Sequence, residues 1–334
     1  MKHPTSPCSF RPVRPVWWAT LLMAGALSCG QAPAAPQGWI TNQGDHSVSV
    51  VDLASHAVTA TIPVAKSPAG VVAVPRAGKV FVTAPDANAL TVIDMKTGQA
   101  LATLPAGQGA VGLDASPDGR RVYVADWFGQ QLLGFDTASH RQVLRVPLGK
   151  APAGVAVGSD GATVWVAERD DNHVAAVDVA SATVRSRFPV GEHPFALLFD
   201  GPRQRLYVLN VYSDDVSVLD VRDPATPRLL GRVGVGKAPY GAALAAAGSR
   251  LYVTNQRDDT VTVIDPDTLQ VLQTLTGFGY PEGVASKGDR VWVVNWMDEN
   301  LIELEATTGR RLREVGLGRN PRGFGAFVGD PAAP

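Results

Sequence analysis

The sequence predicts an all-β protein, a seven-bladed β-propeller with four antiparallel strands in each blade. Two observations lead to this prediction. One pattern recurs seven times without a gap, and its copies begin near residues 38, 80, 122, 164, 206, 251 and 291. Each copy contains four short segments of β-branched, aromatic and small residues, and the period of a helical repeat is absent. Four short strands in about 40 residues are the signature of one propeller blade.

The third copy shows the expected order of strands. They are expected at 122–125, 132–136, 142–149 and 153–161, with turn residues between them. The last of the four follows the proline that most copies carry, and we expect it to be the innermost strand of its blade.

One aromatic residue recurs at the second position of the first strand in every copy. These residues are Trp39, Phe81, Tyr123, Trp165, Tyr207, Tyr252 and Trp292. A sevenfold register favours packing between adjacent blades, where each ring covers apolar area that would otherwise face water. A stripe of rings that stacks on a cofactor is the alternative interpretation.

A carboxylate ends the second strand of every copy. These residues are Asp52, Asp94, Asp136, Asp178, Asp220, Asp265 and Glu305. Most of them precede a turn, where a carboxylate accepts hydrogen bonds from backbone amides. We therefore assign them no catalytic role.

The phase of the repeats predicts how the ring closes. Residues 322–328 match the innermost strand of the other copies, and the blade begun by residues 38–64 has no such strand before it. We expect the C-terminal strand to complete the N-terminal blade, which removes two exposed sheet edges.

The first 34 residues are expected to form a signal peptide. Lys2, Arg11 and Arg14 give a positive start, and the apolar run 16–27 is too short for a comfortable membrane span. Small residues follow, with cleavage expected after Ala34. The protein would then be periplasmic or secreted, and its single domain would span residues 35–334.

Cys29 leaves a second possibility open. The segment 26–29, "ALSC", is similar to a lipobox with alanine where leucine is usual, so the protein could be a lipoprotein anchored through Cys29. Both cysteines, Cys8 and Cys29, lie in this leader. The propeller is therefore expected to rely on its core and its closed ring and not on disulfides.

Four motifs resemble those of the YVTN-repeat, or YncE-like, β-propeller family. They are "LYVTN" at 251–255, "VIDP" at 263–266, "VGVGKAPYG" at 233–241 and "SPDG" at 116–119. The resemblance covers nearly all of the chain after the leader and implies a secreted or periplasmic seven-bladed propeller. Related propellers include nucleic-acid- or surface-binding proteins, subunits of quinone- or haem-dependent dehydrogenases, and lactone hydrolases. The resemblance therefore implies little about activity.

The charge balance narrows the class of partner. The chain carries 30 basic and 31 acidic side chains, and a formal net charge of −1 does not favour nucleic acid. No stretch after residue 38 is apolar for long enough to cross a bilayer. We expect a monomer whose partner is a protein or a small ligand.

Residues that break the repeat on one propeller face are the candidates for function. Trp127, Tyr212 and Trp296 lie in loops outside the core aromatic register, and Arg169 and Arg257 lie between them in repeat order. Rings that alternate with guanidinium groups suit an anionic or aromatic ligand or a protein partner. Local covering of the loops is the alternative interpretation.

His193 and Asp114 also depart from the repeat. His193 lies beside Glu192, but no HxH, HxxxH or CxxC spacing accompanies it, so no metal site is predicted. Asp114 interrupts the small residues of the predicted channel wall, where it could hold a cation or be solvated by channel water.

We predict an exported, non-enzymatic propeller that binds a partner protein or a small ligand through the loop-bearing face. An accessory or cofactor-holding component of a periplasmic redox system is the alternative, and a lactonase-like hydrolase comes third. No cofactor is evident, because the sequence has no CxxCH haem attachment and no phosphate-binding glycine loop. One carboxylate in the channel is also too few for the ligand set of a metal-dependent lactonase propeller.

Overall fold

The computed structural model describes residues 1, 3–4, 9 and 35–331. The predicted signal peptide lies almost wholly outside the described residues, and so do its cleavage site and the lipidation candidate Cys29. None of the helices described is both long enough and apolar enough to cross a membrane.

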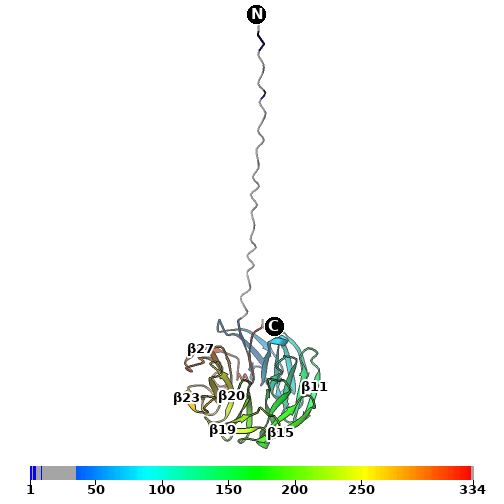
Figure 1. The fold of residues 1–334 in the computed structure, drawn as a ribbon, viewed down its shortest axis with the longest axis vertical. Coiled ribbons are helices and arrows are strands. Elements are labelled where there is room, and N and C mark those ends of the chain that lie inside the picture. Colours follow the sequence, from blue (N-terminus) through cyan, green and yellow to red (C-terminus); the bar gives the residue numbers. More distant parts are fainter. Residues whose placement is uncertain (2, 5–8, 10–34, 332–334) are drawn as a thin grey trace. The chain divides into compact units, whose positions relative to one another are not determined.

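Seven four-stranded antiparallel sheets confirm the predicted fold class (Figure 1). Blade 1 contains β28 (Val328–Gly329), β1 (Gln37–Asn42), β2 (Ser47–Asp52) and β3 (Ala57–Pro63). Blade 2 contains β4 (Val71–Val74), β5 (Lys79–Ala84), β6 (Ala89–Asp94) and β7 (Ala100–Pro105). Blade 3 contains β8 (Ala110–Ala115), β9 (Arg121–Asp126), β10 (Gln131–Asp136) and β11 (Gln142–Pro147). Blade 4 contains β12 (Pro152–Val157), β13 (Thr163–Glu168), β14 (His173–Asp178) and β15 (Thr183–Pro189).

The remaining three blades repeat this order. Blade 5 contains β16 (Pro194–Asp200), β17 (Arg205–Asn210), β18 (Asp215–Asp220) and β19 (Arg228–Gly234). Blade 6 contains β20 (Pro239–Ala245), β21 (Arg250–Asn255), β22 (Thr260–Ile264) and β23 (Val271–Thr276). Blade 7 contains β24 (Pro281–Lys287), β25 (Arg290–Asn295), β26 (Asn300–Glu305) and β27 (Arg311–Gly316). Short 3₁₀ turns occur at η1 (Pro75–Ala77), η2 (Pro85–Ala87) and η3 (Arg169–Asp171).

The strand that follows the proline position is the innermost of its blade, as predicted. In Figure 1 the outermost strands β11, β15, β19, β23 and β27 lie around the periphery, whereas β20 lies toward the centre. Burial follows the same order: β12 is buried along its whole length, and β15 alternates exposed with half-buried residues.

All seven aromatic residues of the repeat register are buried, and each is at most 3% exposed. Phe81 of blade 2 belongs to a core cluster with Val122 and Leu133 of blade 3. Tyr123 of blade 3 likewise packs in a cluster with Val164 of blade 4. The rings therefore join neighbouring sheets, which confirms the packing interpretation over the cofactor stripe.

The carboxylates that end the second repeat strand stabilise turns, also as predicted. Asp94 accepts hydrogen bonds from the backbone N–H groups of Lys96 and Thr97 at 3.0 and 2.8 Å. Asp136 accepts one from the backbone of Ser139 at 2.7 Å. These backbone hydrogen bonds lower the pKa of both carboxyl groups from the usual value.

Neighbouring blades approach closely at a glycine near the start of an inner strand. A Cβ added to Gly154 in β12 would lie 2.3 Å from the carbonyl oxygen of Phe195 in β16. A Cβ added to Gly241 in β20 would lie 2.4 Å from the carbonyl oxygen of Glu282 in β24. The strands can approach this closely only because glycine has no side chain. The same approach recurs at Gly70, Gly112 and Gly283.

The C-terminal strand β28 closes the ring as the repeat phase predicts. It pairs antiparallel with β1, and Asn42 forms a further bridge with Pro321. Between these two points the chain also reaches blade 2, because the carbonyl of Phe324 accepts a hydrogen bond from the Val71 N–H at 2.8 Å. The segment therefore completes blade 1 and holds it against blade 2.

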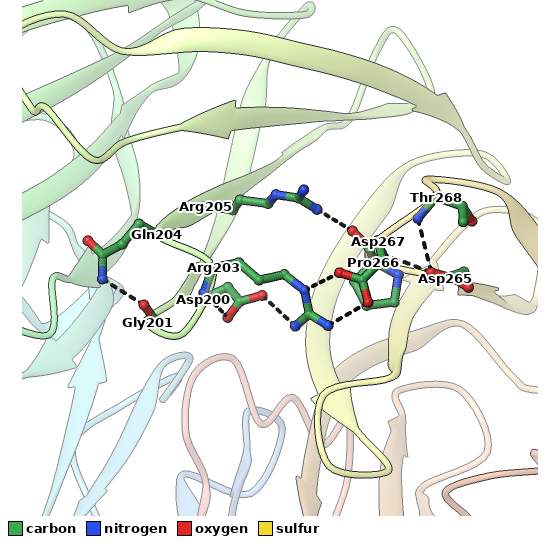
Figure 2. A network of polar contacts seen from close by, with 9 residues as sticks. All are labelled: Asp200, Gly201, Arg203, Gln204, Arg205, Asp265, Pro266, Asp267 and Thr268. Atoms are coloured by element: carbon green, nitrogen blue, oxygen red, sulfur yellow. Dashed lines mark hydrogen bonds and ion pairs between the residues drawn. The ribbon is translucent and has the colours of Figure 1, made fainter.

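The face formed by the hairpins between inner strands and their neighbours, here the hairpin face, carries a charged brace between blades 5 and 6. Figure 2 shows Arg203 beside Asp200, with the closest atoms 3.1 Å apart. The same guanidinium donates to both oxygens of Asp267, at 2.6 and 3.0 Å. Arg205 donates to the Pro266 carbonyl. Asp200 is buried, so Arg203 supplies the partner that a buried carboxylate needs.

Truncation before Arg322 should destabilise the whole propeller, because it removes β28 and leaves the edge of β1 unpaired. We expect a lower urea midpoint than for the full chain. A chain ending at Pro331 is the control, since it keeps every described residue of the propeller. Equal midpoints and slopes for the chain truncated before Arg322 and the control would contradict the closure.

Gly154→Ala should destabilise the protein by about 2–3 kcal/mol, because the new Cβ overlaps the Phe195 carbonyl and the two inner strands must separate. Gly234→Ala is the control, because a Cβ there meets no atom within 4 Å. Its effect should stay within about 0.5 kcal/mol. Thermal and urea unfolding measure both, and similar losses would show that the spacing of the blades does not depend on glycine.

Candidate ligand-binding face

The opposite face, here the loop face, is formed by turns such as β9–β10 and by the connections between blades. The residue before the proline position has a positive φ in every copy, and these residues are Ser67, Gly109, Ala151, His193, Ala238, Tyr280 and Asn320. Because six of the seven share a φ between 50° and 55°, with Gly109 at 149°, the positive φ belongs to the loop geometry. The left-handed backbone of His193 is therefore no sign of function by itself.

Four of the predicted site residues meet on this face and are called the arginine cluster: Trp127, Arg169, His193 and Tyr212. The guanidinium carbon of Arg169 lies 5.4 Å from the ring centroid of Trp127 and 5.5 Å from that of Tyr212. The rings of His193 and Tyr212 stack with 4.0 Å between centroids. Arg169 also pairs with Asp170 at 2.5 Å. The cluster is thus a preassembled surface of rings around one cation.

The other two candidates on this face do not join the arginine cluster. Trp296 packs against Tyr280, with 5.5 Å between the ring centroids. Arg257 is exposed in the turn between β21 and β22, and within the described residues it lies over no aromatic ring. The predicted alternation of rings and cations around the mouth is therefore present on one side only.

Trp296 lines a pocket at the mouth of the channel, here the mouth pocket, with a volume of about 420 Å³. Its lining residues are Phe195, Tyr240, Gln256, Tyr280, Glu282, Trp296, Met297 and Arg322. The lining combines aromatic rings and a thioether with the polar side chains of Gln256, Glu282 and Arg322. Small-molecule sites usually have this composition and a volume of this order.

Glu282 is the buried polar centre of the mouth pocket, and its side chain is only 1% exposed. Its Oε1 accepts a hydrogen bond from Gln256 Nε2 at 2.8 Å. Its Oε2 lies 3.7 Å from Arg322 Nη1 and has no hydrogen-bond partner among the described residues. Burial raises the pKa of Glu282 to about 7, and the Arg322 charge and the Gln256 hydrogen bond offset this only in part.

Arg322 is held in place by two neutral acceptors. Its Nη1 donates to the hydroxyl of Tyr240 at 2.9 Å, and its Nε donates to Gln43 Oε1 at 3.0 Å. The guanidinium is thereby fixed beside Glu282 without a bidentate ion pair. Its remaining N–H groups are not used by these two bonds.

Most of the mouth pocket is not marked by the sequence motifs, although one repeat position carries the signal. The residue after the proline position is Ala69, Val111, Ala153, Phe195, Tyr240, Glu282 and Arg322 in the seven copies. The first three are small or aliphatic, and the last four are large or charged. Consecutive copies place these four side chains at neighbouring blades, so the run of exceptions marks one sector of the mouth.

Asp114 lines a second cavity, of about 370 Å³, inside the channel. Its two oxygens accept hydrogen bonds from the backbone N–H groups of Ala115 and Val157, both at 2.8 Å. Burial raises the pKa of Asp114 to about 6 despite these bonds. The carboxylate therefore braces β8 against β12. The described residues contain no group of three His, Cys, Asp or Glu side chains that could hold a metal ion.

Three aromatic rings lie between the mouth pocket and the channel cavity. Phe195 stacks on Tyr240 with 4.7 Å between centroids, and Phe324 lies 5.1 and 5.5 Å from them. Phe195 and Tyr240 line the mouth pocket, whereas Phe324 lines the cavity. Phe195 also lies 6.3 Å from Trp127, which links the mouth pocket to the arginine cluster.

These features define a seven-bladed β-propeller with a candidate ligand pocket at one end of its channel. The family model described as a YNCE-like beta-propeller matches residues 72–160. This match and the seven-bladed ring together confirm the resemblance to the YncE-like propeller family. No curated protein matches the chain.

Solved structures share the fold at low sequence identity. A protein from Desulfotomaculum acetoxidans DSM 771, described as functionally unknown, has a TM-score of 0.75 and 16% identity over 88% of this chain and 98% of that one. Kuenenia stuttgartiensis hydrazine synthase has a TM-score of 0.73 and 19% identity over 80% and 92%. The dihydro-heme d1 dehydrogenase NirN, solved in complex with DHE, has a TM-score of 0.66 and 15% identity over 88% and 75%. At these identities the likeness shows the fold alone.

Glu282→Gln should raise the melting temperature near pH 8 and change it little near pH 5. The pKa of about 7 in the folded state lies above the usual 4.5, so the folded protein is most stable with Glu282 protonated. That stability is present below about pH 4.5 and is lost as the pH rises through 7. Glutamine mimics the protonated form and should recover about 3 kcal/mol at high pH.

The matched control is Glu192→Gln, because Glu192 is exposed on the same face. As a surface substitution, it should change the melting temperature little at either pH. A difference between wild type and Glu282→Gln that is constant from about pH 5 to pH 8 would contradict the raised pKa.

Proposed function

We propose that this protein is an exported binding protein that takes a small ligand into the mouth pocket. The observation that carries the proposal is the Glu282 carboxylate, which is buried in the pocket lining with one oxygen lacking a hydrogen-bond partner in the described part of the chain. A buried acceptor in this state costs free energy, and a ligand that donates a hydrogen bond to it recovers that cost.

The arginine cluster supports a site that extends beyond the mouth pocket. Tyr212 is 52% exposed, and Trp127 contacts Phe195 of the pocket wall. A ligand larger than the pocket would reach these rings. Recognition of a partner protein through the same rings is the other form of this proposal, since exposed aromatic and arginine side chains are typical of protein hot spots.

A role in a periplasmic redox system is the second candidate, and the fold shared with hydrazine synthase and NirN favours it. The support is limited to the fold, because both identities are below 20%. An absorption spectrum of protein purified from its native host separates the two candidates. A haem or quinone band would favour the redox role. Export of the protein stays a prediction from the leader sequence.

The small-molecule fraction of a native-host extract should raise the melting temperature of the wild-type protein, because a ligand that binds only the folded state stabilises it. Glu282→Gln and Trp296→Ala should abolish this shift. Phe128→Ala should keep it, since Phe128 is 69% exposed on the same face and does not line the mouth pocket. A shift retained in both pocket variants would place the ligand elsewhere and overturn the proposal.

A further inference from the structure

The charged side chains of the mouth pocket balance each other when Glu282 is ionised, above its pKa of about 7. Glu282 Oε2 and Arg322 Nη1 lie 3.7 Å apart, and both residues are largely buried, with side chains 1% and 23% exposed. The other lining residues, Phe195, Tyr240, Gln256, Tyr280, Trp296 and Met297, carry no formal charge. A cationic ligand would meet Arg322 and an anionic ligand would meet Glu282, at short range and with little water to screen them. The pocket therefore favours a neutral ligand.

The polar side of the mouth pocket offers an acceptor and donors close together. Glu282 Oε2 is an acceptor without a partner among the described residues. Arg322 has five N–H donors, and its bonds to Tyr240 and Gln43 use only two of them. A hydroxyl group both donates and accepts, so two adjacent hydroxyl groups on one ring match a carboxylate beside a guanidinium.

The other side of the mouth pocket offers flat apolar surfaces at an angle to one another. The rings of Tyr280 and Trp296 are inclined by 52°, and those of Phe195 and Tyr240 by 30°. A saturated ring that carries C–H groups on its faces and hydroxyl groups on its edge can pack on such walls and still reach the polar side. A flat aromatic ligand without a hydrogen-bond donor would leave Glu282 unpaired.

Building on the proposed binding function, we infer that the ligand of the mouth pocket is a neutral polyhydroxylated ring, a sugar or a cyclitol. One hydroxyl group donates to Glu282 Oε2, its neighbour accepts from Arg322, and one face of the ring packs on Trp296. The volume of about 420 Å³ suits a ligand of one or two such rings.

Titration calorimetry and tryptophan fluorescence with glucose, galactose, mannose, N-acetylglucosamine, maltose and myo-inositol test this inference on the purified protein. At least one of them should bind, and its charged relatives, glucosamine and glucuronate, should bind about tenfold more weakly or not at all. Choline tests whether the pocket instead binds an organic cation through its aromatic rings alone.

Variants place the bound sugar in the pocket. Glu282→Gln should weaken its binding by about tenfold or more, because a charge-assisted hydrogen bond is lost. Trp296→Ala should abolish binding, and Trp296→Phe should restore part of it if the ring face is the contact. Phe128→Ala should bind like wild type. Circular dichroism melts confirm that each variant is folded.

The outcomes separate this inference from the proposed function. Binding of choline, glucosamine or glucuronate in preference to every neutral ring would overturn the ligand class. Failure of all neutral rings, with a Glu282-dependent shift still seen with native extract, would reject the sugar and leave the proposed function standing. Sugar binding that is unchanged in both Glu282→Gln and Trp296→Ala would overturn the placement of the ligand in the mouth pocket. An extract shift that both variants also retain would overturn the proposed function itself.

Discussion

The close contact between blades, where an inner-strand glycine meets a carbonyl oxygen of the next blade, sets both the spacing of the ring and the backbone of the mouth pocket. The carbonyls that face Gly154 and Gly241 belong to Phe195 and Glu282, which line the mouth pocket. Thr254 holds the second carbonyl further, with a hydrogen bond of 2.7 Å from its Oγ1. The same contacts that set the spacing of the blades therefore set the backbone of the site, which gives its side chains the rigid support that precise recognition needs.

A glutamate at position 282 lowers the stability of the fold, because its charged form is buried. The equivalent residues in other blades, Ala69, Val111 and Ala153, show that the ring forms without a charge there. The raised pKa of Glu282 reflects the free energy lost by burying its charged form, and Arg322 offsets that loss only in part. Residues that lower stability in this way are typical of sites where activity depends on them.

The fold could be predicted from the sequence because every blade places residues of the same kind at the same strand positions. The register of Tyr252 and the phase of residues 322–328 were enough to place the core and the closure. The mouth pocket could not be predicted in this way, because Glu282 differs from its repeat equivalents and acquires its partners from other blades. Trp296 was found as a departure from the register. Arg257 departs equally and lies exposed, since the direction of a loop side chain depends on its own turn.

Closure by β28 has a consequence for the synthesis of the chain. The backbone N–H of Gly323 donates to Thr41 Oγ1 across 282 residues of sequence, so this contact waits for nearly the whole propeller to be translated. Until then blade 1 is a three-stranded sheet with an open edge at β1, while the other six blades can already fold. Such an edge invites pairing with another nascent chain. The C-terminal segment of the propeller thus converts a site of misassembly into the contact that holds the ring together.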